Sequence, residues 1–507
     1  MTLIHRIPVE RRHAETCHLN FVQKRVQVNE EIGSSSKSSI KVLAKTLLRK
    51  GTTAMEQYTG FSANASLALV AEWTKSNHIW EDLADGVHIH QKTIRHSPSD
   101  KLKDLLINMW AGGIRVSSVN NLLRTDEGLQ RLFGRSACAE QSVISETLNA
   151  VTGENIIETT RFIQKVYRTH SLSCQHEYEK NWLLLDADLT GILAGKTAEG
   201  SEKGYFSGTR NGRGRQVGRV YASQYDEILS EQLYSGKVQL EVSLQELVEM
   251  TENLLNSTEQ SRKRTVIRVD GGGGTDKNID WLLQRGYWML LKVKNWQRTQ
   301  KLVQTVTTWH VLPELPGHDV GWVETPHAYA KATRQLAIRW PKEKGGFHYC
   351  VLVFNLTDLM MFQLAGFLMP KRLTQQDLFS AIMKAYNLRS GGVETSIKNS
   401  KQGLGLNRRN KKRFHAQHMM LLLAQLAYNI AVWSRNRLAQ HSAAIAGFGM
   451  LRLIRDAFRI SGKIHYDENG KVHAIVLNQS HKLAKPFYET WHACFSRNDL
   501  LLILGKI

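Results

Sequence analysis

Acidic residues at three places in this chain of 507 residues have the type and the context of ligands for a divalent metal ion. Asp186 and Asp188 lie two residues apart in the predicted strand NWLLLDADLT, so both side chains project from one face of a sheet. Asp270 ends the apolar segment TVIRVD and precedes four glycines, which predicts a carboxylate at the sheet edge where α/β proteins bind ligands. Glu394 lies in a predicted helix, seven residues before Lys401 on the same face.

Two strand-end aspartates and one helical glutamate form an oxygen-rich ligand set, which hard divalent ions such as Mg²⁺ prefer. Two such ions held about 4 Å apart can activate a water molecule or a 3′-hydroxyl group and stabilise the leaving oxygen of a phosphodiester. Each acid also has a simpler interpretation: a strand end in solvent, a cap for the following turn, or a surface Glu–Lys pair. Taken together, the three acids favour metal-dependent phosphoryl transfer.

The charge balance predicts a polyanionic partner. The chain has 67 Lys and Arg against 46 Asp and Glu, a net charge of +21. Two segments, KGYFSGTRNGRGRQVGR and LNRRNKKRF, concentrate this charge, although such runs are often only solvated surface. The candidates for contact with DNA phosphates in these segments are Lys203, Arg210, Arg213, Arg215 and Arg219, and Arg408, Arg409, Lys411, Lys412 and Arg413.

An α/β framework has to position these residues. Apolar runs predict the order β-β-β-α-β-α-β, with strands in NWLLLDADLT, GRQVGRVYAS, KVQLEVS, RTVIRVD and YWMLLKVK. Further strands are expected in TVTTWHVL, RQLAIRW and FHYCVLVFN, and a hairpin at residues 468–470. We expect a polar arm (1–40), a helical DNA-binding region (41–178), the first part of the core (179–294), a β-rich insertion (295–370), the second part of the core (371–435) and a C-terminal region (436–507).

One helix pair in the helical region could read DNA bases. The segment GLQRLFGRSACAEQSVISETLNAVT predicts two helices joined by a short turn, similar to a helix-turn-helix. Such a pair could bring Gln141, Ser142 and Ser145 to base edges, but two packed helices of any helical domain give the same pattern.

Several classes of protein are disfavoured. The five cysteines lie far apart, which argues against a disulfide framework or a zinc finger. The charged N-terminal segment lacks the apolar stretch of a signal peptide. The strongest apolar run, residues 419–433, is shorter than the ~20 residues that span a bilayer. We therefore expect a cytoplasmic protein without a membrane partner, in which this run is a core helix.

Several of these residues together resemble a known family, the DDE transposases of bacterial insertion sequences. The resemblance extends over about residues 100–480 and includes an Asp-x-Thr motif at 188–190, whose register favours Asp188 over Asp186 as the ligand. It is closest to the group with a Tyr-x2-Arg-x3-Glu-x6-Lys signature, here Tyr386, Arg389, Glu394 and Lys401. Four residues instead of three separate the arginine from the glutamate, and the pair at 391–392, both glycine, could accommodate the extra one.

The resemblance implies an α/β fold: an RNase H-like mixed-sheet catalytic core with a β-rich insertion and a helical N-terminal DNA-binding region. It implies that Asp188, Asp270 and Glu394 bind two Mg²⁺ or Mn²⁺ ions, with Asp186 as an additional or alternative ligand. Contacts to DNA phosphates would come from Tyr386, Arg389 and Lys401. One tryptophan of the insertion would stack on a flipped base, the candidates being Trp296, Trp309, Trp322 and Trp340.

The function implied is transposition: hydrolysis at the ends of a mobile element, then attack of the 3′-hydroxyl on target DNA. The partners would be double-stranded DNA, as terminal inverted repeats and target, and a second copy of the chain in a homodimer, at the bacterial nucleoid. Two alternatives stay open, a two-metal DNA nuclease without strand transfer and a transposase-derived DNA-binding protein without catalysis.

Overall fold

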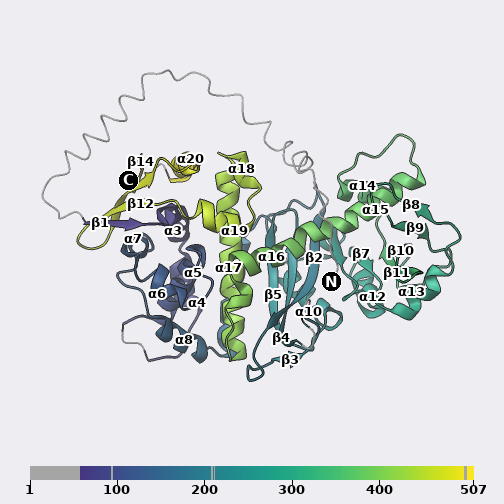
Figure 1. The fold of residues 1–507 in the computed structure, drawn as a ribbon, viewed down its shortest axis with the longest axis horizontal. Coiled ribbons are helices and arrows are strands. Elements are labelled where there is room, and N and C mark those ends of the chain that lie inside the picture. The colour runs from purple at the N-terminus through teal and green to yellow at the C-terminus, as the bar shows by residue number, and fades with distance from the viewer. Residues whose placement is uncertain (1–57, 93–94, 207–208, 210–211, 496–499) are drawn as a thin grey trace, which may run out of the picture.

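The computed structural model describes residues 58–507 except 93–94, 207–208, 210–211 and 496–499. The expected arm (1–40) lies outside the described residues. Figure 1 shows a helical part on the left, a long helix α17 (Phe414–Ala439) beside it, and a large sheet on the right. Helix α17 is buried over most of its length, which confirms the predicted core helix. None of the described helices combines the length and the apolar character needed to cross a membrane.

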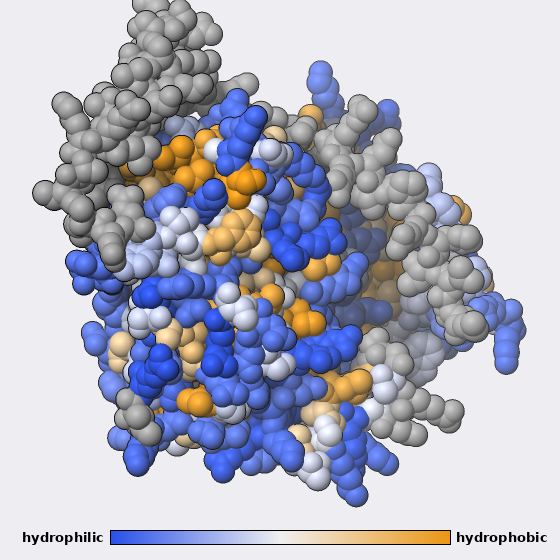
Figure 2. Space-filling model, turned by 60° about the vertical axis from the view of Figure 1, so that its left-hand side comes forward, coloured by the Kyte–Doolittle hydropathy of each residue, from blue (hydrophilic) through white to orange (hydrophobic). Residues whose placement is uncertain are grey.

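The described residues before β2 (Leu183–Leu193) form mainly helices. Its helices are η1 (Ala65–Leu67), α3 (Ala68–Ser76), α4 (Ile79–Gly86), α5 (Pro98–Trp110), α6 (Ser118–Leu122), α7 (Glu127–Leu132), α8 (Gln141–Ala150) and α9 (Gly153–His170). Reciprocal capping boxes begin α5 at Ser97 and α9 at Thr152, which explains where both helices start. On the face turned forward in Figure 2, apolar side chains form small separate groups within a mostly hydrophilic surface.

Strand β1 (Tyr58–Ser62) joins the two ends of the described chain. It pairs with β12 (Gly462–Tyr466) in a four-stranded sheet of order β1-β12-β13-β14, with β13 (Val472–Asn478) and β14 (Leu501–Gly505). The predicted hairpin is confirmed, since β12 and β13 are antiparallel and Gly470 has a φ of +78° in the turn. The other C-terminal elements are α18 (Ala443–Ala446), α19 (Met450–Arg452), η4 (Leu453–Ala457) and α20 (Ala484–Phe495).

A mixed sheet forms the core, as predicted. Its central strands lie in the order β5-β4-β2-β6-β7, in which β2 is parallel to β6, β6 is parallel to β7, and β4 is antiparallel to β2 and β5. The strands are β2 (Leu183–Leu193), β4 (Arg213–Ala222), β5 (Glu227–Ser235), β6 (Thr265–Val269) and β7 (Trp288–Lys292), with the short β3 (Glu202–Lys203) beside β4. Helices α10 (Leu240–Leu255), α11 (Glu259–Arg262) and α12 (Asp276–Gln284) connect the parallel strands.

The third strand lies earlier in the sequence than predicted. The segment KVQLEVS was expected to be a strand, but α10 begins within it at Leu240, and the strand is β5. The alternation of Val238, Leu240 and Val242 suggested a strand. The helical spacing of Leu240, Leu244 and Leu247, all buried, determines the outcome.

The strands of the predicted β-rich insertion continue the same sheet, because β11 pairs antiparallel with β7. The elements are α13 (Trp296–Val303), β8 (His310–Val311), β9 (Asp319–Trp322), β10 (Arg334–Pro341), β11 (Phe347–Phe354) and α14 (Asp358–Ala365). The strand expected in TVTTWHVL is only two residues long. Helix α15 (Gln375–Arg389), the π-helical turn η2 (Ser390–Glu394) and α16 (Thr395–Gly403) then cross the sheet, followed by η3 (Leu406–Arg408) (Figure 1).

A buried carboxylate connects the helical part to the sheet. Glu227, at the start of β5, accepts hydrogen bonds from Ser171 Oγ (2.6 Å), Ser173 Oγ (2.6 Å) and Trp433 Nε1 (2.6 Å). The backbone N–H groups of Leu172 and Ser173 also donate to it. One side chain therefore holds the connection between α9 and β2 together with helix α17.

We expect Glu227→Ala to lower the free energy of unfolding by about 3 kcal/mol or more, because several buried donors would lose their acceptor. Chemical denaturation of the purified protein measures this change. Glu227→Gln keeps one acceptor oxygen and is expected to cost less. A loss below about 1 kcal/mol for Glu227→Ala would show that the network does not hold the two parts together.

Candidate functional site

The three predicted acids come from two parallel strands and the turn above them. Asp188 lies in β2, and Asp270 directly follows β6. The β2–β6 register pairs Ala187 with Val269, so the next residues along the two strands are these two acids. Glu394 is the last residue of η2. The edge of the sheet and the crossing helix thus bring together carboxylates that are 206 residues apart in the chain (394 − 188).

The three carboxylates meet around one guanidinium group. Arg389 Nη2 lies 2.6 Å from Glu394 Oε1 and 3.9 Å from Asp270 Oδ2, and Arg389 Nη1 lies 3.5 Å from Asp188 Oδ2. The arginine side chain is only 6% exposed, whereas the side chains of Asp188, Asp270 and Glu394 are 21%, 47% and 45% exposed. The acids therefore line an opening to solvent with the arginine at its base.

Arginine is an incomplete partner for this acid cluster, which we define as Asp188, Asp270 and Glu394. Nε and Nη1 of Arg389 are buried without a hydrogen-bond partner. No group of three His, Cys, Asp or Glu side chains among the described residues is arranged to hold a metal ion directly, and Arg389 lies where the three carboxylates meet. The ligand chemistry nevertheless fits a hard divalent cation, since carboxylate oxygens surround a point that already holds positive charge.

A π-helical turn joins Arg389 to Glu394. A π turn adds one residue to an α-helix. Across η2, residues five positions apart therefore lie on the same face, as residues four apart do in an α-helix. Arg389, directly before η2, donates from Nη2 to Glu394 Oε1 at 2.6 Å. Glycine is required at 392, because a Cβ there would lie 2.7 Å from Asp186 Oδ2 and even closer to Ser223 Oγ.

Asp186 lies on the same side of β2 but is buried in an ion pair of its own. Its carboxylate accepts from Arg268 Nε (2.6 Å) and Nη2 (2.8 Å) and also from Ser223 Oγ. Both oxygens are therefore engaged away from the opening, so this geometry favours Asp188 as the ligand from this strand. Sequence reasoning missed Arg268, although an arginine inside the apolar run TVIRVD signals a buried partner.

The predicted phosphate contacts of the crossing helix lie at the rim of the acid cluster. Tyr386 donates its hydroxyl hydrogen to Asp270 Oδ1 (3.2 Å), and Lys401 Nζ donates to Thr190 Oγ1 (2.7 Å). Thr190 is the threonine of the Asp-x-Thr motif. The structure thus brings Tyr386, Arg389 and Lys401 to the same opening as the acids.

The two basic segments meet in space, and part of their charge is buried. Arg215 and Arg219 lie inside strand β4 and are buried. Arg215 donates to the backbone oxygens of Lys411 (2.8 Å) and Lys412 (2.7 Å), which joins the segments. Arg409 is buried against the backbone oxygen of Gly113. Lys203, Arg408, Lys412 and Arg413 are exposed, Arg213 and Lys411 are half-buried, and Arg210 lies outside the described residues.

Two of these cations, Lys411 and Arg413, adjoin the predicted base-reading helix α8. Lys411 Nζ donates to Ser145 Oγ (3.2 Å), and Arg413 Nη1 donates to the backbone oxygen of Asn149 (2.7 Å). Gln141 and Ser145 are half-buried and Ser142 is exposed on α8. Helix α8 and the segment 408–413, which we call the basic turn, therefore form one continuous surface. Its contact with DNA stays a prediction.

The pKa values of the two aspartates of the cluster are shifted in opposite directions. Burial raises the pKa of Asp188 to about 6, against the opposing effect of Arg389. Burial acts in the same direction on Asp270, but the N–H of Gly271 and the charges of Arg389 and Lys292 outweigh it and leave the pKa of Asp270 below its ordinary value. Burial also raises the pKa of Tyr386, so its hydroxyl stays protonated.

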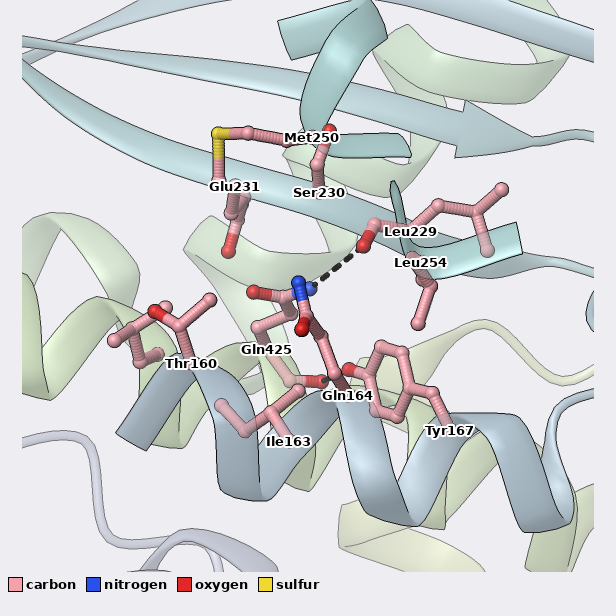
Figure 3. Close-up of a pocket in the computed structure, with 11 residues that line it drawn as sticks. Thr160, Ile163, Gln164, Tyr167, Leu229, Ser230, Glu231, Met250, Leu254 and Gln425 are labelled. Atoms are coloured by element: carbon pink, nitrogen blue, oxygen red, sulfur yellow. Dashed lines mark hydrogen bonds between the residues drawn. The ribbon is translucent and has the colours of Figure 1, made fainter. Parts of the chain in front are cut away.

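A pocket of about 330 Å³ opens beside Asp270. Its lining includes Gly271, Lys292, Lys294, Trp296, Thr299 and Tyr349. Trp296 is 55% exposed, whereas Trp309, Trp322 and Trp340 are partly buried against the cores. A second cavity, where α9, β5, α10 and α17 meet, measures about 20 Å³, room for about one water molecule and too small for a nucleotide (Figure 3).

Comparisons with known proteins identify the family. Residues 54–488 match the family described as transposase DDE domain group 1. Among solved structures, a piggyBac transposase synaptic complex with hairpin DNA aligns with 79% of this chain and 82% of that chain, at 10% sequence identity and a TM-score of 0.42. None of the curated proteins compared with the chain matches it.

Gly392→Ala is expected to displace η2 from the sheet, because its Cβ would overlap Ser223 and Asp186. Gly391→Ala is the matched control, since a Cβ there meets no atom within 4 Å. We expect a melting temperature several degrees lower for Gly392→Ala and a small change for Gly391→Ala. Equal melting temperatures for the two variants would contradict the close approach.

Asp188→Asn is expected to stabilise the protein at neutral pH. The raised pKa means that ionising Asp188 costs the folded state free energy, and this cost grows as the pH rises from the ordinary pKa of about 4 to about 6 and is constant above that. The variant should match the wild type below about pH 3 and exceed its unfolding free energy by about 2 to 3 kcal/mol above pH 7. Denaturation at several pH values measures this, and an Asn variant that is less stable at pH 8 would contradict it.

Proposed function

We propose that this chain, which belongs to the transposase DDE domain family of group 1, cleaves phosphodiester bonds at the ends of a mobile element and joins the 3′-hydroxyl to target DNA. The observation that carries the proposal is the convergence of Asp188, Asp270 and Glu394 around Arg389. The strand order β5-β4-β2-β6-β7, with its first three strands antiparallel and the rest parallel, supports an RNase H-like core.

The acid cluster would hold two Mg²⁺ or Mn²⁺ ions through its carboxylate oxygens. Bound there, the ions would activate water or a 3′-hydroxyl and stabilise the leaving oxygen. With that positive charge present, Arg389 is no longer needed between the carboxylates, and its planar fork suits a DNA phosphate. Tyr386, protonated at neutral pH, can donate to a second phosphate oxygen.

The surroundings of the cluster support double-stranded DNA as the partner. Lys401 lies at the opening, and the surface of α8 and the basic turn presents Arg408, Lys412 and Arg413. These cations would bind the backbone of the element end. Trp296 is the candidate for stacking on a flipped base, because it is exposed in the pocket beside Asp270. Two element ends require a second copy of the chain in the active complex.

The test uses a plasmid that carries the DNA from both sides of this coding sequence, with purified protein and Mg²⁺. We expect joined products that contain the plasmid ends and target DNA, and no cleavage when the metal is chelated. Asp270→Ala should lower cleavage by at least 10³-fold and leave DNA binding within about twofold, because it removes only a carboxylate ligand. Unchanged cleavage by this variant would remove Asp270 from the site.

Other outcomes favour the alternative functions. Hydrolysis without joined products would indicate a two-metal nuclease. Tight binding of the same DNA without any cleavage would indicate a DNA-binding protein derived from a transposase. Salt dependence does not separate them, because each binds the DNA backbone through the same cations.

A further inference from the structure

The side chain of Glu394 is 45% exposed, so packing around the carboxylate itself does little to fix its position. The turn before it is seated on the sheet, because Val393 is buried and Gly392 lies against Ser223 and Asp186. A carboxylate displaced by about 1 Å can cost 10²-fold in rate. Contacts of the helices on either side of the turn also bear on the position of Glu394.

Arg219 of β4 makes the contact after the turn. It is 1% exposed and donates Nε to Glu231 Oε1 (2.7 Å), which keeps its charge paired within the sheet. Its remaining hydrogens reach α16: Nη1 donates to Ser396 Oγ (2.9 Å), and Nη2 donates to Ser400 Oγ (2.9 Å). Glu231 itself lies on β5 where α9, α10 and α17 meet, as Figure 3 shows, so this contact extends to the interior.

Arg268 of β6 makes the contact before the turn, and it too is paired with a carboxylate of the sheet while it donates to the helix. It is 1% exposed, pairs with Asp186 through two hydrogen bonds, and donates Nη1 to the backbone oxygen of Ala385 in α15 (2.6 Å). Asp186 in turn lies directly under Gly392. Each arginine is thus anchored to the sheet by an ion pair with one carboxylate, and it donates its remaining N–H groups to the crossing helix.

We propose that Arg219 and Arg268 are positioning residues that fasten α15, η2 and α16 to strands β4 and β6 and so set the place of Glu394 relative to Asp188 and Asp270. Neither arginine is within the acid cluster, so both act through the helix. Buried ion pairs alone add little stability over apolar packing of the same shape. These two ion pairs orient each guanidinium group so that its remaining N–H groups point at the crossing helix. Their role in positioning Glu394 rests on the proposed function of the cluster.

The test removes the helix contacts and leaves the ion pairs in place. The variant Ser396→Ala/Ser400→Ala removes both acceptors of Arg219 on α16 while Glu231 stays. It also removes the bond from Ser396 Oγ to the backbone oxygen of Val393 (2.7 Å), so Ser400→Ala alone, which keeps that bond, is measured beside it and should give a smaller change of the same sign. The matched control is Ser230→Ala/Thr251→Ala, which removes a buried hydroxyl pair (2.9 Å) between β5 and α10, away from the acids. The test variant leaves buried N–H groups of Arg219 without an acceptor, whereas the control removes both hydroxyl groups of a pair, so we expect the melting temperature to fall further in the test variant.

We expect the test variant to lower kcat for DNA cleavage by 10- to 100-fold and to weaken Mn²⁺ binding, measured by calorimetry, about tenfold. DNA affinity should stay within twofold, because the cations that bind DNA are unchanged. The control should change neither quantity by more than about twofold. Equal values of kcat and Mn²⁺ affinity in the two variants would overturn the proposal.

Backbone amide exchange separates this proposal from the proposed function. In the test variant, amides of residues 390–403 should exchange at least tenfold faster than in the wild type, and in the control they should not. If the wild type neither cleaves DNA nor binds Mn²⁺, the proposed function fails, and the exchange data still decide whether Arg219 fastens the helix. Unchanged exchange at 390–403 would refute that contact even in an active enzyme.

Discussion

Three carboxylates can share one corner of a sheet only if positive charge lies between them. In this structure Arg389 supplies that charge from the same helix that carries Glu394, and its guanidinium nitrogens lie 2.6 to 3.9 Å from all three acids. The positive charge does not act equally on the three acids. Burial raises the pKa of Asp188, whereas the N–H of Gly271 and the charges of Arg389 and Lys292 outweigh burial at Asp270 and lower its pKa. The cluster is therefore charged, partly open to solvent and incompletely satisfied, as expected for a site that binds something else during its function.

Several arginines have structural roles. Arg215, Arg219, Arg268 and Arg409 are buried and donate to carboxylates, hydroxyls or backbone oxygens, and Arg219 and Arg268 do so beside the acid cluster. A net charge of +21 therefore overstates the cationic surface available to DNA. Arg215 and Arg409 hold the segment 408–413 in place, whereas Arg408, Lys412 and Arg413 are exposed and Lys411 and Arg413 contact the α8 region.

Sequence patterns predicted the elements that depend on local periodicity. The strands around Asp188 and Asp270 and the core helix α17 followed from apolar runs. The pairing of β1 with β12 could not be predicted, because it joins residues about 400 positions apart and neither strand signals its partner. The burial of Arg215 was missed for a related reason. A charged residue predicts exposure to solvent, and only the folded structure shows that backbone oxygens of Glu199 and Lys411 take the place of water as its acceptors.

The π turn between Arg389 and Glu394 sets the direction of the helix that follows it. Within a continuous α-helix, one added residue would rotate everything after it by about 100°. The π turn confines the added residue to 390–394, so Ile397 and Ser400 of α16 still face the sheet and Lys401 reaches Thr190. Glycine at 392 makes the turn possible because it lets the backbone rest on the Asp186–Ser223 contact. The helix itself therefore fits the spacing of Arg389 and Glu394 to the strands below it.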